Sequence, residues 1–408
     1  MSQQETTTEG LQRLSRRMEQ MSESKTIRMA RMSRELKAQG HDIISLSLGE
    51  PDFNAPDPVK QAAHEAIDQN YSHYPPVGGF GDLRQAICHK LERDNQLSYK
   101  PQQVVVSTGA KQSLANIFLS LLDTGDELLT AAPYWVSYPE MTKLTGAAFR
   151  VMDTRIEEDF KIRPEQLEAA LNERTRIFLL CAPSNPTGTV YSREELRELT
   201  AVLQRHPEVL IVSDEIYEYI QFEGRHASLA QFPGLFERTV IVNGLSKSFA
   251  MTGWRLGYIA APQWIAQACE KLQGQFTSGA NAVAQRAAIA ALEGGSALAA
   301  TMLQAFEKRR NLLVQGLSAI PGMQVNKPQG AFYLFPKVSA FFGRQTRHQT
   351  TIEDAEALCM YLLEDAGVST VPGDAFGAPE YIRLSYATHE QQLEQAIARI
   401  TRSLQALR

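Results

Sequence analysis

The feature of this chain that most restricts its fold is a regular alternation of short apolar runs with longer amphipathic segments across residues 104–242. Each run is rich in Val, Ile and Leu, which predicts a strand buried on both faces. The amphipathic segments predict helices that cover both faces of a mostly parallel sheet. We therefore expect an α/β three-layer sandwich, with strands at residues 104–107, 127–131, 149–152, 176–181, 209–212 and 240–242.

The rest of the chain predicts a second, smaller domain. Long helical patterns follow residue 262, with separate helices expected at residues 282–292 and 301–317, and the tail then mixes strands with helices. This mixture is typical of an α+β domain. We expect residues 1–54 to supply a tail, a helix and a strand that join the small domain, residues 55–300 to form the large domain, and residues 301–408 to form the small α+β domain.

Local chemistry marks the start of two helices. Asp57 followed by Pro58 predicts an N-cap with proline at the first helical position. Ser192 with Glu195 three residues later predicts a capping box.

Composition excludes several classes of function. Of the 408 residues, 43% are hydrophobic and 21% are charged, as in ordinary soluble globular proteins. The net charge of -5 argues against broad binding to nucleic acid or to an anionic membrane. We find no apolar run of bilayer length and no secretory signal. The four scattered cysteines predict reduced thiols and a cytoplasmic protein.

The segment 243–257 carries the strongest chemical signal. It follows the last apolar run and holds Lys247 together with Ser246, Arg255 and three glycines. Partial desolvation would lower the pKa of this lysine and free its amine as a nucleophile toward a carbonyl. We therefore hypothesise a Schiff-base lysine with a phosphate-binding serine and arginine beside it.

Other residues follow the predicted strands at the edge where open parallel sheets bind ligands. Gly109 opens a helix N-terminus suited to a phosphate, although on its own an ordinary turn is the commoner case. Trp135 could stack on a flat heteroaromatic ring, although a core tryptophan is the commoner case. Asn185 supplies an amide in a segment that turn chemistry alone also explains.

Asp214 stands directly at the end of another predicted strand, with Tyr217 three residues later. A buried carboxylate needs a cationic partner, and a protonated pyridine nitrogen is one. The tyrosine could reach the 3-oxygen of the same ring, while helix capping by Asp214 is the plain alternative. Taken together, these residues predict a pyridoxal phosphate site without a metal ion.

The sequence resembles the fold-type-I, class I pyridoxal-phosphate aminotransferases, and specifically the bacterial aspartate aminotransferase subgroup. The resemblance runs from about residue 15 to residue 404, and many ordered motifs make it specific. It is carried by residues 48–53, 74–78, 133–141, 185–188, 213–217, 246–255, 330–333 and 382–386. One departure is Ser184, where close relatives often carry Asn.

The resemblance implies a role for each matching residue at the cofactor. Lys247, Asp214 and Tyr217 would be catalytic, as the Schiff-base lysine, the partner of the ring nitrogen and a partner of the ring 3-oxygen. Tyr74 would reach the phosphate of a neighbouring subunit, which implies a homodimer with shared sites. The other cofactor-binding residues would be Asn185 at the 3-oxygen, Trp135 against the ring, and Gly109, Ala110, Lys111, Ser246 and Arg255 around the phosphate.

The same resemblance implies how a substrate binds. Arg383 would grip the α-carboxylate as a planar fork, assisted by the Gly49 backbone and by Trp135 and Asn185. Lys111 and Thr26 match positions associated with the distal carboxylate. Arg28 lies near Thr26 and could contribute to a pocket for prephenate, although a solvated helix charge is the commoner case.

The implied reaction is transfer of the amino group from L-aspartate to 2-oxoglutarate, giving oxaloacetate and L-glutamate by a ping-pong mechanism. A glutamate/aspartate–prephenate aminotransferase, an aromatic aminotransferase and a β-lyase remain as alternatives with the same cofactor. A pyridoxal-phosphate-binding regulator is a more distant alternative, and the residues before 43 are too few for its DNA-binding domain.

Overall fold

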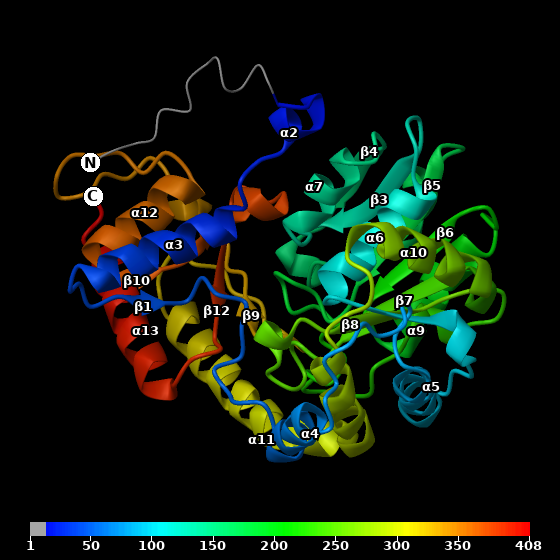
Figure 1. Ribbon diagram of the computed structural model, residues 1–408. Coiled ribbons are helices and arrows are strands. Elements are labelled where there is room, and N and C mark those ends of the chain that lie inside the picture. The colour runs from blue at the N-terminus through cyan, green and yellow to red at the C-terminus, as the bar shows by residue number, and fades with distance from the viewer. Residues whose placement is uncertain (1–13) are drawn as a thin grey trace.

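The computed structural model describes residues 14–408, so the N-terminal end of the predicted tail lies outside the described residues. Its centre is a seven-stranded sheet in the order β2-β8-β7-β6-β5-β3-β4 (Figure 1). Only β8 runs antiparallel to its neighbours. The strands are β2 (Val104–Ser107), β3 (Glu127–Ala132), β4 (Ala148–Asp153), β5 (Thr175–Cys181), β6 (Leu210–Asp214), β7 (Thr239–Gly244) and β8 (Gly257–Ala260).

Helices cover both faces of this sheet, because side chains alternate between the faces along each strand. One face packs against α6 (Ala110–Leu121), α7 (Ser137–Lys143) and α10 (Gln263–Phe276). The other packs against α5 (Gly81–Asn95), α8 (Pro164–Ala170), α9 (Arg193–Leu203) and α11 (Ala282–Ser318). The predicted three-layer α/β fold with a mostly parallel sheet is therefore confirmed.

A second lobe lies beside the sheet and has its own core, which joins the two ends of the chain (Figure 1). Met29 and Ile44 pack there with Leu362 and Leu393. The lobe contains α3 (Lys25–Ala38), α12 (Ala355–Asp365) and α13 (Glu390–Gln405), the pair β1 (Ile44–Ser45) and β10 (Val368–Ser369), and the sheet β11 (Val371–Pro372), β12 (Ile382–Ser385) and β9 (Tyr333–Leu334). The domain boundaries given above stay a prediction.

Two local expectations differ from the structure, and a third is confirmed. Residues 282–318, labelled α11, consist of two helices that meet at a kink at Gly295, between the two predicted helices. A Cβ at Gly295 would lie 2.7 Å from Arg93 Nη2, so a glycine suits both the kink and the contact. Strand β8 was not predicted, because its four residues follow directly on the irregular segment that carries Lys247.

The prediction of Asp57 as an N-cap is also wrong. The N-cap of α4 (Asp57–Asp68) is Pro56, and Asp57 lies in the first turn, where its negative charge still suits the positive end of the helix. The capping box of α9 is confirmed, with Ser192 Oγ accepting from Glu195 N at 3.2 Å.

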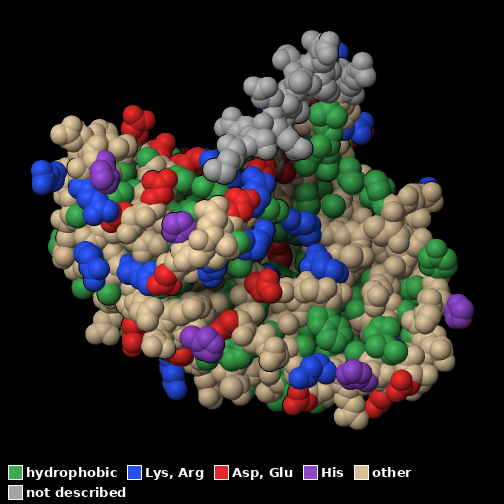
Figure 2. All heavy atoms as spheres, turned by 60° about the vertical axis from the view of Figure 1, so that its left-hand side comes forward, with side chains coloured by type: hydrophobic (Ala, Val, Ile, Leu, Met, Phe, Trp, Pro, Cys, Tyr) green, Lys and Arg blue, Asp and Glu red, His purple; other side chains and the backbone are tan. Residues whose placement is uncertain are grey.

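The surface charges and the longest helix bear on whether the protein binds nucleic acid or a membrane. Lys and Arg side chains are interspersed with Asp and Glu side chains on the face drawn in Figure 2. Among the described residues, α11 is the one helix that is long and apolar enough by composition to cross a membrane. It packs against α4, α5 and α13 and buries Ala287, Phe306 and Leu313, as a core helix does.

Candidate active site

One cavity of about 320 Å³ lies where the carboxyl ends of the parallel strands face the small lobe. It brings together residues that are far apart in the sequence. All but two of the predicted site residues line it, namely Thr26, Gly49, Ala110, Lys111, Trp135, Asn185, Asp214, Tyr217, Ser246, Lys247, Arg255 and Arg383. The two exceptions are Gly109, directly behind Arg255, and Tyr74, on an exposed loop.

Lys247 lies in the loop after β7, and its Nζ donates a hydrogen bond to the Gly49 carbonyl oxygen at 2.5 Å. Burial lowers the pKa of this amine to about 8, against an opposing effect of Glu50. The cations Arg383, Arg255 and Lys111 lower it further. A lysine with such a pKa has a substantial neutral fraction near physiological pH, as a nucleophile or base requires.

Asp214 is the last residue of β6 and is 4% exposed. Its Oδ2 accepts a hydrogen bond from the Tyr138 hydroxyl at 2.6 Å, and its Oδ1 accepts from the Ile216 backbone N–H at 3.3 Å. Burial raises the pKa of this carboxyl to about 6, although both hydrogen bonds favour the ionised form. A cation placed in the cavity would pair with this carboxylate and keep it ionised.

Aromatic groups frame the space above Asp214. The ring of Trp135 meets that of Tyr138 edge to face, with centroids 5.4 Å apart. The Tyr217 hydroxyl lies 2.8 Å from the Tyr333 hydroxyl. Both tyrosines are buried, so each phenol needs a hydrogen-bond partner, and each has one in the other.

The turn between β2 and α6 forms a cradle with no room for side-chain atoms. Gly109 is the N-cap of α6 and has a φ of 81°, which favours glycine. A Cβ there would lie 2.5 Å from Arg255 Nη2, and a Cβ at Gly257 would lie 2.2 Å from Ala110 N. An arginine held against the N-terminus of a helix is a suitable place for a phosphate.

Arg383 lies on β12 and is 2% exposed. Its Nη1 donates to Asn185 Oδ1 at 2.9 Å, and its Nη2 donates to the Ser47 carbonyl oxygen at 2.8 Å. Its Nε is buried and has no partner within the described residues. A buried guanidinium with an unused donor is suited to a carboxylate.

Two further polar groups border the cavity near the N-terminal helix. Lys111 Nζ lies 5.0 Å from the centroid of the Trp135 ring, and burial lowers the pKa of this lysine, helped by Arg255. The hydroxyl of Thr26 is buried and has no partner within the described residues. Arg28 lies outside the cavity, where its Nη1 pairs with Glu356 Oε1 at 3.0 Å.

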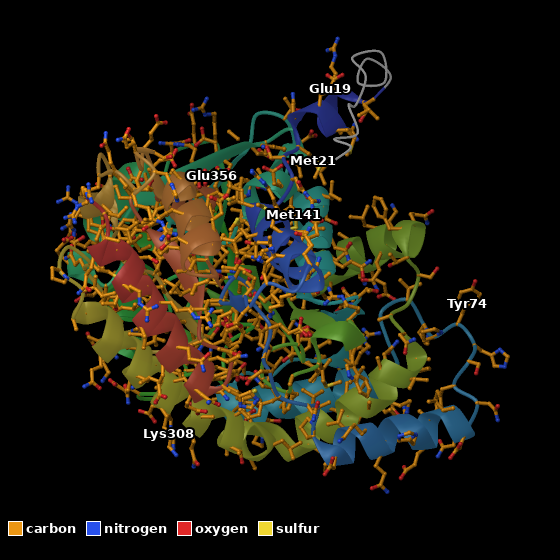
Figure 3. The ribbon with its side chains drawn as sticks, turned by 90° about the vertical axis from the view of Figure 1, so that its left-hand side faces the viewer. Glu19, Met21, Tyr74, Met141, Lys308 and Glu356 are labelled. Atoms are coloured by element: carbon orange, nitrogen blue, oxygen red, sulfur yellow. The ribbon has the colours of Figure 1, made fainter. Side chains whose placement is uncertain are left out.

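Tyr74 is 95% exposed and projects from the edge of the molecule (Figure 3). It does not line the cavity of its own chain. Its predicted role, contact with the phosphate of a second subunit, stays a prediction.

Sequence reasoning missed Tyr138 and Tyr333, which also line the cavity. Tyr138 lies three residues after Trp135 and therefore on the same side of a helical turn, a spacing that could have revealed it. Tyr333 meets Tyr217 across 116 residues of sequence, and no local pattern points to that contact.

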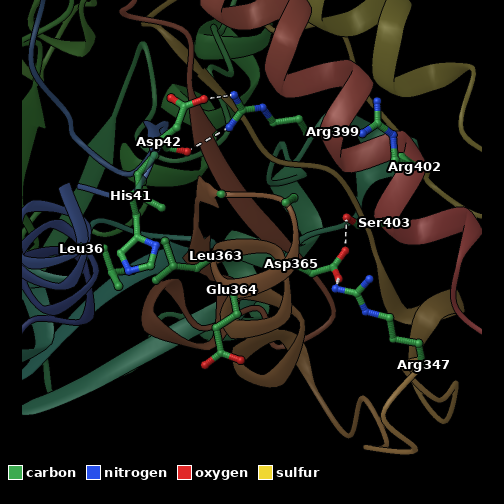
Figure 4. Close-up of a pocket in the computed structure, with 13 residues that line it drawn as sticks. Leu36, His41, Asp42, Arg347, Leu363, Glu364, Asp365, Arg399, Arg402 and Ser403 are labelled. Carbon is green, nitrogen blue, oxygen red and sulfur yellow. Dashed lines mark hydrogen bonds and ion pairs between the residues drawn. The ribbon is translucent and has the colours of Figure 1, made fainter. Parts of the chain in front are cut away.

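A second cavity, of about 590 Å³, lies among α3, α12 and α13 (Figure 4). None of the predicted site residues lines it. Two of its three arginines are held in ion pairs, Arg399 with Asp42 and Arg347 with Asp365.

The residues of the first cavity fit pyridoxal phosphate. The cradle at Gly109 suits the phosphate, the carboxyl of Asp214 suits the ring nitrogen, and the amine of Lys247 is poised for imine formation. The unpaired donor of Arg383 remains for a substrate carboxylate.

Comparisons with known proteins agree with this chemistry. The family model described as aminotransferase class I and II matches residues 41–400. The chain is 46% identical to the bifunctional aspartate aminotransferase and glutamate/aspartate-prephenate aminotransferase of Petunia hybrida, over 96% of this chain and 82% of that protein. It is 43% identical to the aspartate aminotransferase of Bacillus subtilis (strain 168), over 96% of this chain and 98% of that one.

Solved structures give the same result. The crystal structure of the aspartate aminotransferase from Rhizobium meliloti superposes with a TM-score of 0.93 at 39% identity, covering 97% of this chain and 99% of that one. The aspartate aminotransferase from Thermus thermophilus with maleate has a TM-score of 0.90, also at 39% identity, covering 96% and 99%.

Proposed function

Because the chain belongs to the class I and II aminotransferase family and is a pyridoxal-phosphate-dependent transaminase, we propose that its amino donor is L-aspartate and its acceptor 2-oxoglutarate. The products are oxaloacetate and L-glutamate. One observation supports the choice of dicarboxylic substrates. In addition to the residues that suit the cofactor, the cavity is lined by two cationic side chains, Arg383 and Lys111. The unpartnered Thr26 hydroxyl lines the same cavity.

Two cations suit the two carboxylates of such substrates. Arg383 holds the α-carboxylate through its planar guanidinium, while Asn185 and the Ser47 carbonyl fix the orientation of that fork. Lys111 and Thr26 receive the distal carboxylate. Arg28 does not line this cavity, and its guanidinium is paired with Glu356.

The bound cofactor supplies a ring that accepts electrons from the substrate Cα. Lys247 takes the proton from Cα and later returns it, a task for which a pKa of about 8 is well matched. Asp214 holds the ring nitrogen in its protonated form, and Tyr138 orients the Asp214 carboxylate. Tyr217 would donate a hydrogen bond from its hydroxyl to the ring oxygen, and the buried pair that it forms with Tyr333 would keep water away.

A panel of donors and acceptors tests this assignment. We expect kcat/KM to be highest for aspartate and glutamate with their 2-oxo acids, and initial-rate plots to be parallel. Higher kcat/KM for phenylalanine or cystathionine would refute dicarboxylate specificity, and intersecting lines would refute the ping-pong order.

Prephenate is a second candidate acceptor, with glutamate or aspartate as donor. The Petunia hybrida relative carries both activities in its name, and prephenate also bears two carboxylates. Formation of arogenate from prephenate in the same panel decides whether this chain has that activity too.

We further propose that the protein acts as a homodimer in the cytoplasm. Tyr74 is 95% exposed, which supports a role at a site in a second subunit. All four cysteines are free, which supports a reducing compartment.

Mixing inactive Lys247→Ala chains with Tyr74→Phe chains tests the sharing of sites. Hybrid dimers will have one site with neither substitution, so their activity should exceed that of either parent, whereas no gain would refute shared sites.

A further inference from the structure

Two buried pairs of an acidic and a basic side chain lie just beyond the end of β6, next to Asp214. Glu215 is 1% exposed, and its Oε2 lies 3.0 Å from His226 Nε2. Glu218 pairs with Lys90, and their side chains are 4% and 2% exposed. A buried charge is costly unless an opposite charge neutralises it. Removing one member of either pair would therefore leave a costly uncompensated charge on the other.

Glu215 is tied to Ser213, which precedes Asp214, and to Val242, which pairs with Asp214 from the neighbouring strand β7. Its Oε1 accepts from the Ser213 hydroxyl at 2.7 Å, and its backbone N–H donates to the Val242 carbonyl oxygen at 2.8 Å. Asp214 lines the active-site cavity and Glu215 does not, as expected for neighbours at a strand end. The position of the Glu215 side chain therefore helps to set where Asp214 points.

The charges of the cluster balance only when His226 is protonated. Lys90 neutralises Glu218, which also accepts from the side-chain amides of Asn95 and Asn243. His226 is then the partner of Glu215. Burial lowers the pKa of His226, and the positive charge of Lys90 lowers it further. The carboxylates of Glu215 and Glu218 raise it by more, so the pKa lies above its ordinary value.

The side chain of His226 reaches the protein surface at one edge. Its side chain is 9% exposed, and it lines an open cavity of about 1290 Å³ on the outer side of the cluster. The other charged groups near this opening are mostly held in pairs, Arg93 with Asp94, Lys161 with Glu195 and Glu223 with Lys327.

We propose that His226 is a positioning residue for Asp214: as an imidazolium ion it neutralises Glu215, and it thereby keeps the Asp214 carboxylate ionised and directed at the cofactor ring. Without it, the Glu215 charge stands uncompensated beside Asp214 and favours protonation of that carboxyl. This inference rests on the proposed role of Asp214.

The test compares His226→Gln, Glu215→Gln and the double variant. Pyridoxal phosphate is titrated into each apo-protein, and its dissociation constant is measured by absorbance. At about pH 5, below the pKa of Asp214, His226→Gln should weaken binding by about tenfold, as expected for a rise of one unit in that pKa. The double variant should recover to within about threefold of wild type, because it removes both charges together. A merely structural role would leave the double variant at least as weak as His226→Gln.

His206→Gln is the matched control, since His206 pairs with Glu168 at 3.2 Å on the surface. It should bind the cofactor as wild type does. Binding by His226→Gln within twofold of wild type, or a double variant as weak as His226→Gln, overturns the proposal.

A second measurement does not depend on how His226→Gln folds. The imidazole of His226 is titrated by NMR in protein with 13C-labelled histidine. It should titrate above the ordinary histidine value of about 6.5, and Glu215→Gln should lower its pKa. Titration at or below that value in wild type overturns the proposal.

Asp214→Ala distinguishes a failure of the proposed role of Asp214 from a failure of the proposed role of His226. If it leaves cofactor affinity unchanged, the proposed role of Asp214 fails and the inference fails with it. If it weakens binding while His226→Gln does not, only the inference about His226 fails.

Discussion

The buried carboxyl of Asp214 should reduce the stability of the empty protein. Burial raises its pKa from 3.8 to about 6. A group with a raised pKa in the folded state contributes stability below its unfolded pKa and loses it as the pH rises through the folded value. The wild-type apo-protein should therefore lose about 3 kcal/mol between about pH 4 and about pH 8 through this one group.

Asp214→Asn removes the titration while keeping the shape of the side chain. Relative to wild type, the apo variant should gain stability as the pH rises, by up to about 3 kcal/mol at about pH 8. For a chain of this length, that corresponds to about 3–4 °C in Tm.

The assay is thermal unfolding of both apo-proteins across this pH range. Asp153→Asn, at the exposed end of β4, is the control and should show no pH-dependent difference from wild type. A variant that is equally or less stable than wild type at every pH would refute the reasoning. With excess pyridoxal phosphate, wild type should become more stable than Asp214→Asn, because only the wild-type carboxylate can pair with a protonated ring nitrogen.

Three further substitutions test the other parts of the site. Lys111→Ala should lower kcat/KM by at least about tenfold for aspartate but far less for phenylalanine, and an equal loss for both would restrict Lys111 to the cofactor phosphate. Arg383→Lys should raise KM for all amino acids by about 100-fold, because a lysine cannot reproduce the planar fork of the guanidinium. An unchanged KM would show that Arg383 does not bind the substrate. Gly109→Ala should weaken cofactor binding measurably in the apo-protein titration, because its Cβ would displace Arg255; unaltered affinity would show that the cradle tolerates a methyl group.

The sheet and the residues at its strand ends could be predicted because they depend on local pattern. Each strand carries its own apolar signal, and a parallel sheet brings the residues after its strands to one edge. This is why Lys247, Asp214 and Trp135 could be placed together from sequence alone. The strand β8 gave no such signal, since its pairing depends on the chain turning back after the lysine loop.

Contacts between distant segments were beyond sequence reasoning. The pairing of Tyr217 with Tyr333 and of Arg383 with Asn185 depends on how the small lobe docks against the sheet. The ion pair of Glu215 with His226 likewise becomes visible only when the loop after β6 is folded back. Burial then sets the pKa of each group, and burial is a property of the assembled fold.

The central claim is that Lys247 is the residue that bonds to the cofactor. Borohydride reduction of the enzyme with bound pyridoxal phosphate converts an imine into a stable amine, and mass spectrometry of the digested protein locates it. We predict a single modified peptide, with the added mass on Lys247. Modification of Lys111 or of any other lysine in its place, or no modification at all, would contradict the account.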